Sequence, residues 1–150
     1  MLFKEAFKKS EPLSFRWVFD LNGAVQDFAI NEKCAAGAGS FIEAMARALE
    51  TTVHELGEMA LKSDNPIPMN AQCTIFAESE VVSLIHEKAS KADIARAIHN
   101  SIANRIASLV RRLGIHRDVV LVGGVAKNVG FISSLQKTLG IELLVPEEPE

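Results

Sequence analysis

Residues 31–43 read Asn-Glu-Lys-Cys-Ala-Ala-Gly-Ala-Gly-Ser-Phe-Ile-Glu, so a cysteine and two glycines stand just ahead of an apolar pattern. In that pattern Phe41, Met45 and Leu49 recur at every fourth position, which is the spacing of one helix face. This spacing predicts a helix that starts near residue 36. The stretch therefore combines a thiol with a glycine-rich helix start.

The glycines and the thiol each suggest a ligand. Gly37 and Gly39 can expose backbone amides to a phosphate at the helix start, although glycine is also common there without a ligand. Cys34 lies at or just before the helix N-terminus and next to Lys33. Both neighbours favour the thiolate, which is the form that binds metal.

The second cysteine, Cys73, precedes another helical pattern. Residues 71–77 are apolar and rich in β-formers, which predicts a strand, and residues 78–89 carry apolar side chains at helical spacing. Glu78 and Glu80 are then expected at the helix start, where acidic side chains suit the helix dipole. A cysteine in an apolar strand is most often a small buried side chain. Because the chain has two cysteines, a site with four thiolates needs a second subunit, as in a symmetric dimer.

A pair of glycines follows the apolar run at residues 118–122, which predicts a buried strand, and a helix is predicted from residue 128. A strand that opens into Gly123 and Gly124 lets a ligand approach the backbone, and adenosine or another flat group fits such a place. The alternative is a tight turn between strand and helix that needs a positive φ. Both interpretations remain open from these residues.

The remaining predicted elements alternate between strands and helices. Asn22-Gly23 between two apolar runs predicts a β-hairpin. Thr52 and Ser90 each stand three positions before an acidic residue, which is typical of a helix N-terminus, and Gly114 is expected to end the longest helix. The complete order is hairpin 15–30, helices 36–49 and 53–62, strand 71–77, helices 78–89 and 90–113, strand 118–122, helix 128–139 and strand 141–145. This order predicts an α/β fold.

The composition fits one globular domain. The chain has 150 residues, 48% of them hydrophobic, which suffices for a core of ordinary size. A net charge of −3 with interspersed signs argues against a nucleic-acid or anionic-membrane surface. No apolar run approaches the length of a spanning helix, and no apolar signal region follows Met1, so we expect a cytoplasmic protein with reduced thiols. The histidines share no ligand-like spacing, and each is expected on a solvated helix face or turn: His54, His86, His99 and His116.

Three motifs taken together resemble a known family. They are residues 31–39, the segment Cys73-x-x-Phe76-Ala77-Glu78-Ser79-Glu80-Val81, and Gly-Gly-Val-Ala-Lys-Asn at residues 123–128. They are similar to successive motifs of the activator ATPases (component A) of 2-hydroxyacyl-CoA dehydratases, the BadF/BadG/BcrA/BcrD ATPase family. The resemblance covers residues 15–150 and leaves residues 1–14 as an N-terminal extension. It implies the C-terminal lobe of an actin-, Hsp70- and sugar-kinase-like (ribonuclease H-like) ATPase.

The resemblance also implies a function. Family members are homodimers in which each subunit gives two cysteines to one bridging [4Fe–4S] cluster, and ATP binding and hydrolysis move the helices that lead from it. This movement drives a low-potential electron into a dehydratase or benzoyl-CoA reductase-type partner. Carried over by motif, Cys34 and Cys73 are the cluster ligands. The nucleotide side comprises Gly37, Gly39, Glu43, Gly123, Gly124, Val125 and Asn128.

The sequence departs from the family in its phosphate-handling parts. It has no Asp-x-Gly or Asp-x-Gly-Gly loop to organise Mg²⁺ and water, no small-residue helix after the last strand, and Ala38 and Ser40 where Thr and Arg are usual. We therefore expect the C-terminal lobe alone, with weak binding of ATP or ADP with Mg²⁺, no hydrolysis unaided, and a separate polypeptide as the N-terminal lobe. The alternatives are a truncated, inactive nucleotide-binding or dimerisation module without a cluster, and a small-molecule kinase, which lacks a candidate Asp base.

Overall fold

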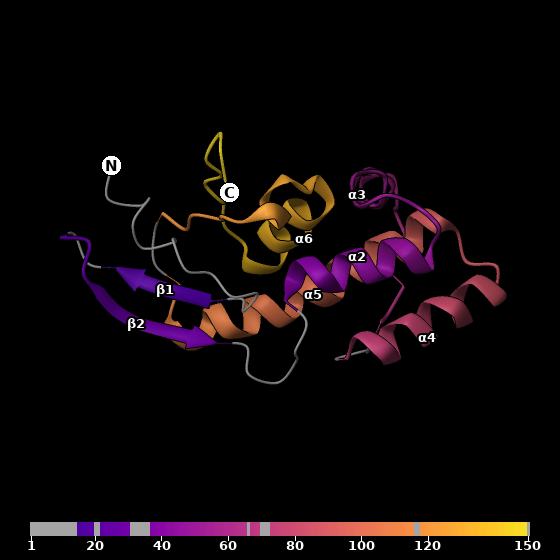
Figure 1. Ribbon diagram of the computed structural model, residues 1–150, viewed down its shortest axis with the longest axis horizontal. Coiled ribbons are helices and arrows are strands. Elements are labelled where there is room, and N and C mark those ends of the chain that lie inside the picture. Colours follow the sequence, from indigo (N-terminus) through magenta and orange to yellow (C-terminus); the bar gives the residue numbers. More distant parts are fainter. Residues whose placement is uncertain are drawn as a thin grey trace.

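The computed structural model describes residues 15–19, 22–30, 37–65, 67–69, 73–115 and 118–149. The predicted N-terminal extension, Cys34 and His116 lie outside these residues. Figure 1 shows a β-hairpin at one end of the molecule and helix α4 (Thr74–His86) at the other, with the long helix α5 (Lys91–Leu113) between them. None of the helices in the described ranges is both long and apolar enough to cross a membrane.

The predicted hairpin is confirmed. Strand β1 (Phe15–Phe19) pairs antiparallel with β2 (Val25–Ile30), and the register shifts by a bulge between Val18 and Phe19. Gly23 in the turn has φ 81°, a left-handed conformation that glycine adopts without steric cost. Both strands pack against α5, so the hairpin is fixed to the longest helix.

Most of the predicted helices are also confirmed. Helix α2 (Ala38–Ala48) begins slightly later than predicted, and α3 (Val53–Leu61) and α6 (Val129–Leu139) match their predicted spans closely. Ser90 caps α5 through a hydrogen bond from the Asp93 amide, and Gly114 ends that helix with φ 83°. Local capping chemistry therefore determines where these helices start and stop.

The predicted strand at residues 71–77 is wrong over residues 74–77, and residues 71 and 72 lie outside the described ranges. Helix α4 begins at Thr74, with Cys73 as its N-cap residue. Ala77 and Val81 are one helical turn apart and are both buried, whereas Ile75 and Phe76 are 70% and 71% exposed. The segment is therefore helical because its two small apolar side chains pack at helical spacing, even though its residue types favour a strand.

The structure also corrects two further predictions, one on the acidic residues of α4 and one on the two C-terminal strands. Glu78 and Glu80 lie well inside α4 rather than in its first turn, so the helix dipole does not explain them. The strands predicted at 118–122 and 141–145 reduce to one parallel bridge, Val120 with Leu144. The Leu121 amide donates to the Leu144 carbonyl at 2.8 Å and the Leu144 amide to the Val119 carbonyl at 2.9 Å, so the two segments pair with each other over a short length.

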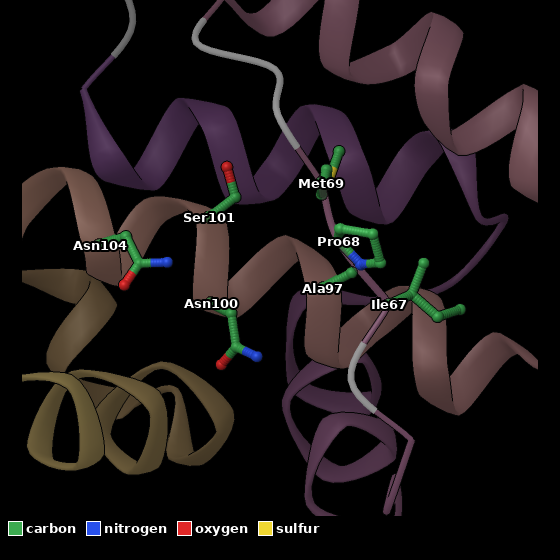
Figure 2. Close-up of a pocket in the computed structure, with 7 residues that line it drawn as sticks. All are labelled: Ile67, Pro68, Met69, Ala97, Asn100, Ser101 and Asn104. Atoms are coloured by element: carbon green, nitrogen blue, oxygen red, sulfur yellow. The ribbon is translucent and has the colours of Figure 1, made fainter.

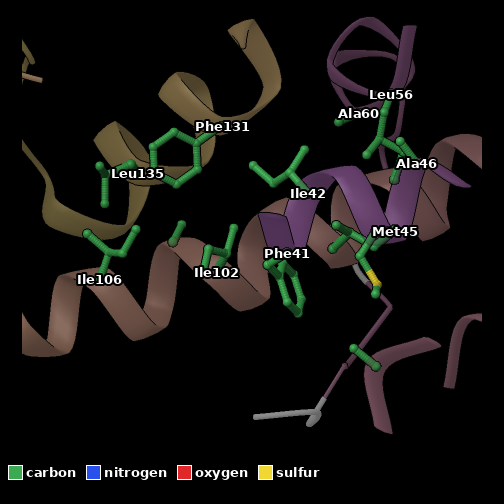
Figure 3. Close-up of a cluster of buried hydrophobic side chains, with 14 of the residues drawn as sticks. Phe41, Ile42, Met45, Ala46, Leu56, Ala60, Ile102, Ile106, Phe131 and Leu135 are labelled. Atoms are coloured by element: carbon green, nitrogen blue, oxygen red, sulfur yellow. The ribbon is translucent and has the colours of Figure 1, made fainter. Parts of the chain in front are cut away.

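The core lies where the helices α2, α3 and α6 pack on α5. Figure 3 shows Ile42 of α2 and Phe131 of α6 pointing toward one another above Ile102 of α5. Each of these side chains is buried, and full burial of a side chain of this size contributes roughly 1.5–3 kcal/mol. The same cluster holds Phe41, Met45, Ala46, Leu56, Ala60, Ile106 and Leu135. Packing of α2, α3 and α6 on α5 therefore fixes where the loops between them lie.

Replacing Thr52 by alanine should lower the free energy of unfolding by about 1 kcal/mol. Thr52 and Glu55 form the predicted capping box: the Glu55 amide donates to the Thr52 hydroxyl at 3.2 Å, and the Thr52 amide donates to the Glu55 carboxylate at 3.0 Å. Urea unfolding measures the change. Thr51→Ala is the matched control, because it removes one hydroxyl from the same carboxylate but leaves the cap intact; an equal loss in both variants would contradict the capping role.

Candidate functional site

The glycine pair forms an open, tight turn. Gly123 has φ 97° and ψ 165°, a conformation restricted to glycine, and a Cβ added to it would meet nothing within 4 Å. Gly124 begins the short 3₁₀ helix η1 (Gly124–Lys127), and the Ala126 amide donates to the Gly123 carbonyl at 2.8 Å. The turn therefore needs glycine for its backbone conformation, and the same glycine leaves the backbone accessible to a ligand.

The start of α2 lies directly against this turn. A Cβ added to Gly39 would be 3.5 Å from Cγ2 of Val125 in η1, an ordinary contact distance. Gly37 is the N-cap residue of α2 in an extended conformation, and its carbonyl accepts from the Ser40 hydroxyl at 3.0 Å. Glu43 is exposed on the same helix. The fold thus brings together two glycine-rich segments that are far apart in the sequence.

Asn128 follows η1 and is only 4% exposed. Its Oδ1 accepts from the Phe131 amide at 2.9 Å, which caps α6, and its Nδ2 donates to the Val53 carbonyl of α3 at 2.8 Å. Oδ1 and one N–H of the amide group are therefore used within the protein. Asn128 can act on a ligand at Gly123 by holding the turn in place.

Cys73 is a free, half-buried thiol at the N-cap of α4. Its carbonyl accepts from the Ala77 amide at 2.9 Å, so the residue is fixed at the N-terminus of the helix. Ile75 and Phe76 expose an apolar surface immediately beside it. Within the described ranges, no three His, Cys, Asp or Glu side chains gather to hold a metal ion, so Cys73 fits a metal only if other thiols join it.

A separate hollow of about 390 Å³ lies between α5 and residues 67–69. Figure 2 shows Asn100, Ser101 and Asn104 on the α5 side and the segment with Pro68 and Met69 on the other. None of the described residues that line it is charged, so they offer a phosphate no cationic partner.

The expectation that His99 is solvated is wrong. His99 on α5 is 0% exposed, and its Nδ1 lies 2.7 Å from the Ala95 carbonyl. Because a carbonyl can only accept, Nδ1 carries the proton. Nε2 is buried and has no hydrogen-bond partner among the described residues. Position 99 falls next to Ile98 and three before Ile102, and this place on the apolar stripe was the signal for its burial.

A comparison with protein families identifies the chain. The model of the BadF/BadG/BcrA/BcrD ATPase family matches residues 16–144. The chain belongs to this family. Among its relatives, the 2-hydroxyisocaproyl-CoA dehydratase activator of Clostridioides difficile is 44% identical over 131 residues, which are 87% of this chain and 49% of the relative. The (R)-2-hydroxyglutaryl-CoA dehydratase activating ATPase of Acidaminococcus fermentans is 44% identical over 122 residues, 81% of this chain and 47% of the relative.

The solved structures agree with the family. The C. difficile activator with bound ADPNP superposes with a TM-score of 0.86 at 43% identity, covering 90% of this chain and 50% of that chain. This BadF/BadG/BcrA/BcrD member therefore has the predicted fold, which is a single lobe of the actin-like ATPase architecture. The chain spans about half the length of the curated relatives it matches.

In this family member, acidification below pH 6.5 should lower the free energy of unfolding through His99. Burial lowers the pKa of His99 below its ordinary value of 6.5, so the unfolded chain takes up a proton that the folded chain does not. The loss is at most about 1.4 kcal/mol per pH unit between 6.5 and the folded pKa. Urea unfolding of the wild type and of His99→Gln at pH 7 and pH 5 measures it, because the variant lacks this titration.

Two carboxylates with lowered pKa values, those of Glu55 and Asp93, titrate at lower pH than this measurement covers. Backbone and side-chain hydrogen bonds from Thr52 lower the pKa of Glu55 below its ordinary 4.5, and hydrogen bonds from Ser63 and Ser90 lower that of Asp93 below 3.8. Their contributions are therefore present above those values and are lost only in more acidic solution. Equal pH slopes for the wild type and His99→Gln would contradict the role of His99.

Proposed function

We propose that this chain is the nucleotide- and cluster-binding half of an ATP-dependent activator that gives a low-potential electron to a 2-hydroxyacyl-CoA dehydratase or benzoyl-CoA reductase-type partner. The observation that carries the proposal is the contact between Gly39 at the α2 start and Val125 of η1, the residue that follows the glycine pair. The two segments come from distant parts of the sequence, and each carries a motif of this family.

The nucleotide part of the proposal rests on the open backbone at Gly123. Adenosine approaches Gly123 and Gly124, while Gly37, Gly39 and Glu43 of the α2 start line the opposite side, with Val125 between the two segments. The C. difficile relative has ADPNP bound, an ATP analogue, which supports the same ligand class here. Two side-chain hydrogen bonds attach Asn128 to α3 and α6, and its amide closes η1 by donating to the Val125 carbonyl at 3.0 Å.

The cluster part rests on Cys73 and Cys34. Cys73 stands at a helix N-terminus beside the exposed Ile75 and Phe76, and such an apolar surface next to a ligand suits contact with a second copy of the chain. Two cysteines from each of two subunits complete a four-thiolate set. When bound, a [4Fe–4S] cluster supplies one-electron chemistry at low potential. Helix α4 starts next to Cys73 and packs against α2, and the start of α2 contacts η1.

The remaining parts follow from the length of the relatives. Because the chain spans about half of their length, we infer that the phosphate and Mg²⁺ loops belong to an N-terminal lobe outside these residues, and that hydrolysis requires that lobe. The whole assembly is a cytoplasmic homodimer, and the dehydratase or reductase component is its electron acceptor.

Anaerobic reconstitution with iron and sulfide tests the cluster. We expect about two irons per chain, a broad brown absorbance that bleaches on reduction, and the mass of a dimer. The Cys34→Ala, Cys73→Ala double variant should lose all three signals, whereas Ser79→Ala, an exposed change on the same helix, should keep them. Iron that survives the double variant would overturn the ligand assignment.

Calorimetry with ATP and ADP tests the nucleotide site separately. Binding that persists in the double cysteine variant would show that the two sites form independently. A monomer that takes up no iron and binds neither nucleotide would leave only the inactive module without a cluster.

A further inference from the structure

The segment that follows the glycine pair is attached to helix α3 through Asn128. The Asn128 side chain is buried, and its Nδ2 donates at 2.8 Å to the carbonyl of Val53, the first residue of α3. Its Oδ1 accepts from the Phe131 amide at 2.9 Å, and its own backbone amide donates to the Val125 carbonyl at 3.0 Å. One residue therefore joins η1, α3 and α6.

Gly57 lies beside this side chain, in the middle of α3. It is buried, and a Cβ added to it would be 2.8 Å from Oδ1, 3.0 Å from Cγ and 3.1 Å from Nδ2 of Asn128. The shortest of these distances is one that real Cβ atoms essentially never show. The carboxamide of Asn128 therefore occupies the space that a side chain at position 57 would fill.

The Asn128 carboxamide cannot give way to a larger residue at position 57 without cost. Its Oδ1 and one N–H bond to two different helices, and a buried polar group that loses its partner is destabilising. Glycine is also less favourable than alanine in the interior of a helix, so Gly57 weakens α3 when that helix is considered alone. The space that it leaves for Asn128 is a physical reason for glycine at this position.

The connection from Asn128 to the nucleotide turn is short. The four residues of η1 lie between Gly123 and Asn128, and within them the Ala126 amide donates to the Gly123 carbonyl at 2.8 Å. The Asn128 amide closes the other end of η1 through its bond to Val125. A displacement of Asn128 therefore shifts the end of η1 and, with it, the glycine pair.

We propose that Gly57 is a positioning residue for the Gly123–Gly124 turn and acts on it through Asn128. Because position 57 carries no side chain, α3 can hold the Asn128 carboxamide, and Asn128 in turn keeps η1 in the conformation that nucleotide needs. The proposal rests on the proposed nucleotide site at this turn. Gly57 lies on α3, outside the two glycine-rich segments assigned to the nucleotide, so its effect on affinity is indirect.

Nucleotide affinity of the full chain provides the first test, measured by calorimetry with ADP. Gly57→Ala places a Cβ against the carboxamide and should raise the Kd about tenfold. Leu56→Ala is the matched control, because Leu56 is the neighbouring buried residue of α3 and belongs to the hydrophobic core. This control should lose stability and keep the Kd within about twofold of the wild type. A Gly57→Ala chain with the wild-type Kd overturns the proposal.

The Asn128→Ser background tests whether the effect passes through Asn128. Serine still caps a helix N-terminus, but its shorter side chain removes the carboxamide that the added Cβ would meet. Asn128→Ser should weaken ADP binding by itself, because the bond to Val53 is lost, and Gly57→Ala should then raise the Kd by less than about twofold more. A further tenfold loss in this background would contradict a path through Asn128.

Hydrogen exchange provides a test that needs no nucleotide. The amides of Ala126 and Asn128 close η1, and Gly57→Ala should speed their exchange relative to the amides of α5, whereas Leu56→Ala should not do so selectively. Unchanged exchange in Gly57→Ala overturns the positioning role. If the wild type binds no ADP while Gly57→Ala still loosens η1, the proposed nucleotide site fails and the positioning role stands.

Discussion

Replacing Gly130 by alanine is expected to lower the free energy of unfolding by about 2 kcal/mol. A Cβ at this position in α6 would lie 2.7 Å from the Gly57 carbonyl oxygen and 2.9 Å from the Gly57 Cα. Both are backbone atoms of α3, so no flexible side chain can move aside, and the two helices would have to separate. Alanine also favours the helix by up to about 1 kcal/mol, which reduces but does not cancel the cost.

Gly39→Ala is the matched control for that change. Gly39 is also the second residue of its helix, but its added Cβ would lie at an ordinary 3.5 Å from Val125. Urea unfolding of both variants isolates the helix contact, and Gly39→Ala should be neutral or slightly stabilising. Equal stability of the two variants would mean that α3 and α6 are not packed as closely as the structure shows.

Replacing Gly123 by alanine should raise the Kd for ADP tenfold or more. The backbone at φ 97° and ψ 165° is restricted to glycine, and forcing a side chain into it costs about 1–3 kcal/mol. Because nothing in the protein faces the added Cβ, the strain is relieved by moving the turn, and the surface proposed for adenosine moves with it. Calorimetry with ADP measures the loss.

Gly140→Ala separates strain from ligand binding. Gly140 ends α6 with φ 71° and ψ 26°, and an added Cβ there also meets nothing, so alanine is strained at a point away from the turn. We expect both variants to lose stability and only Gly123→Ala to lose affinity. If the Gly123→Ala chain binds ADP as tightly as the wild type does, Gly123 serves only the backbone conformation of the turn and not nucleotide binding.

Elements with a local chemical signature were predictable from the sequence. The Asn22-Gly23 turn, the Thr52 and Ser90 caps and the Gly114 stop each depend on neighbouring residues, and the structure confirms them. The predicted helix at residues 78–89 covers most of α4, but the first turn of α4 was not predictable in this way, because its β-forming residues are overruled by the packing of Ala77 and Val81. The burial of His99 was not predicted, because histidine as a residue type favours the surface, whereas this histidine lies beside the apolar stripe of α5.

The sequence by itself determined the family motifs, the helix ends and the two glycine-rich segments, because short-range sterics and capping hydrogen bonds need only neighbouring residues. Only the tertiary structure decided that these segments meet, that Asn128 is buried and bonded to α3 and α6, and that His99 is buried on α5. These features depend on contacts between residues far apart in the chain. Such contacts form when α2, α3 and α6 pack on α5, and no periodicity along the sequence records them.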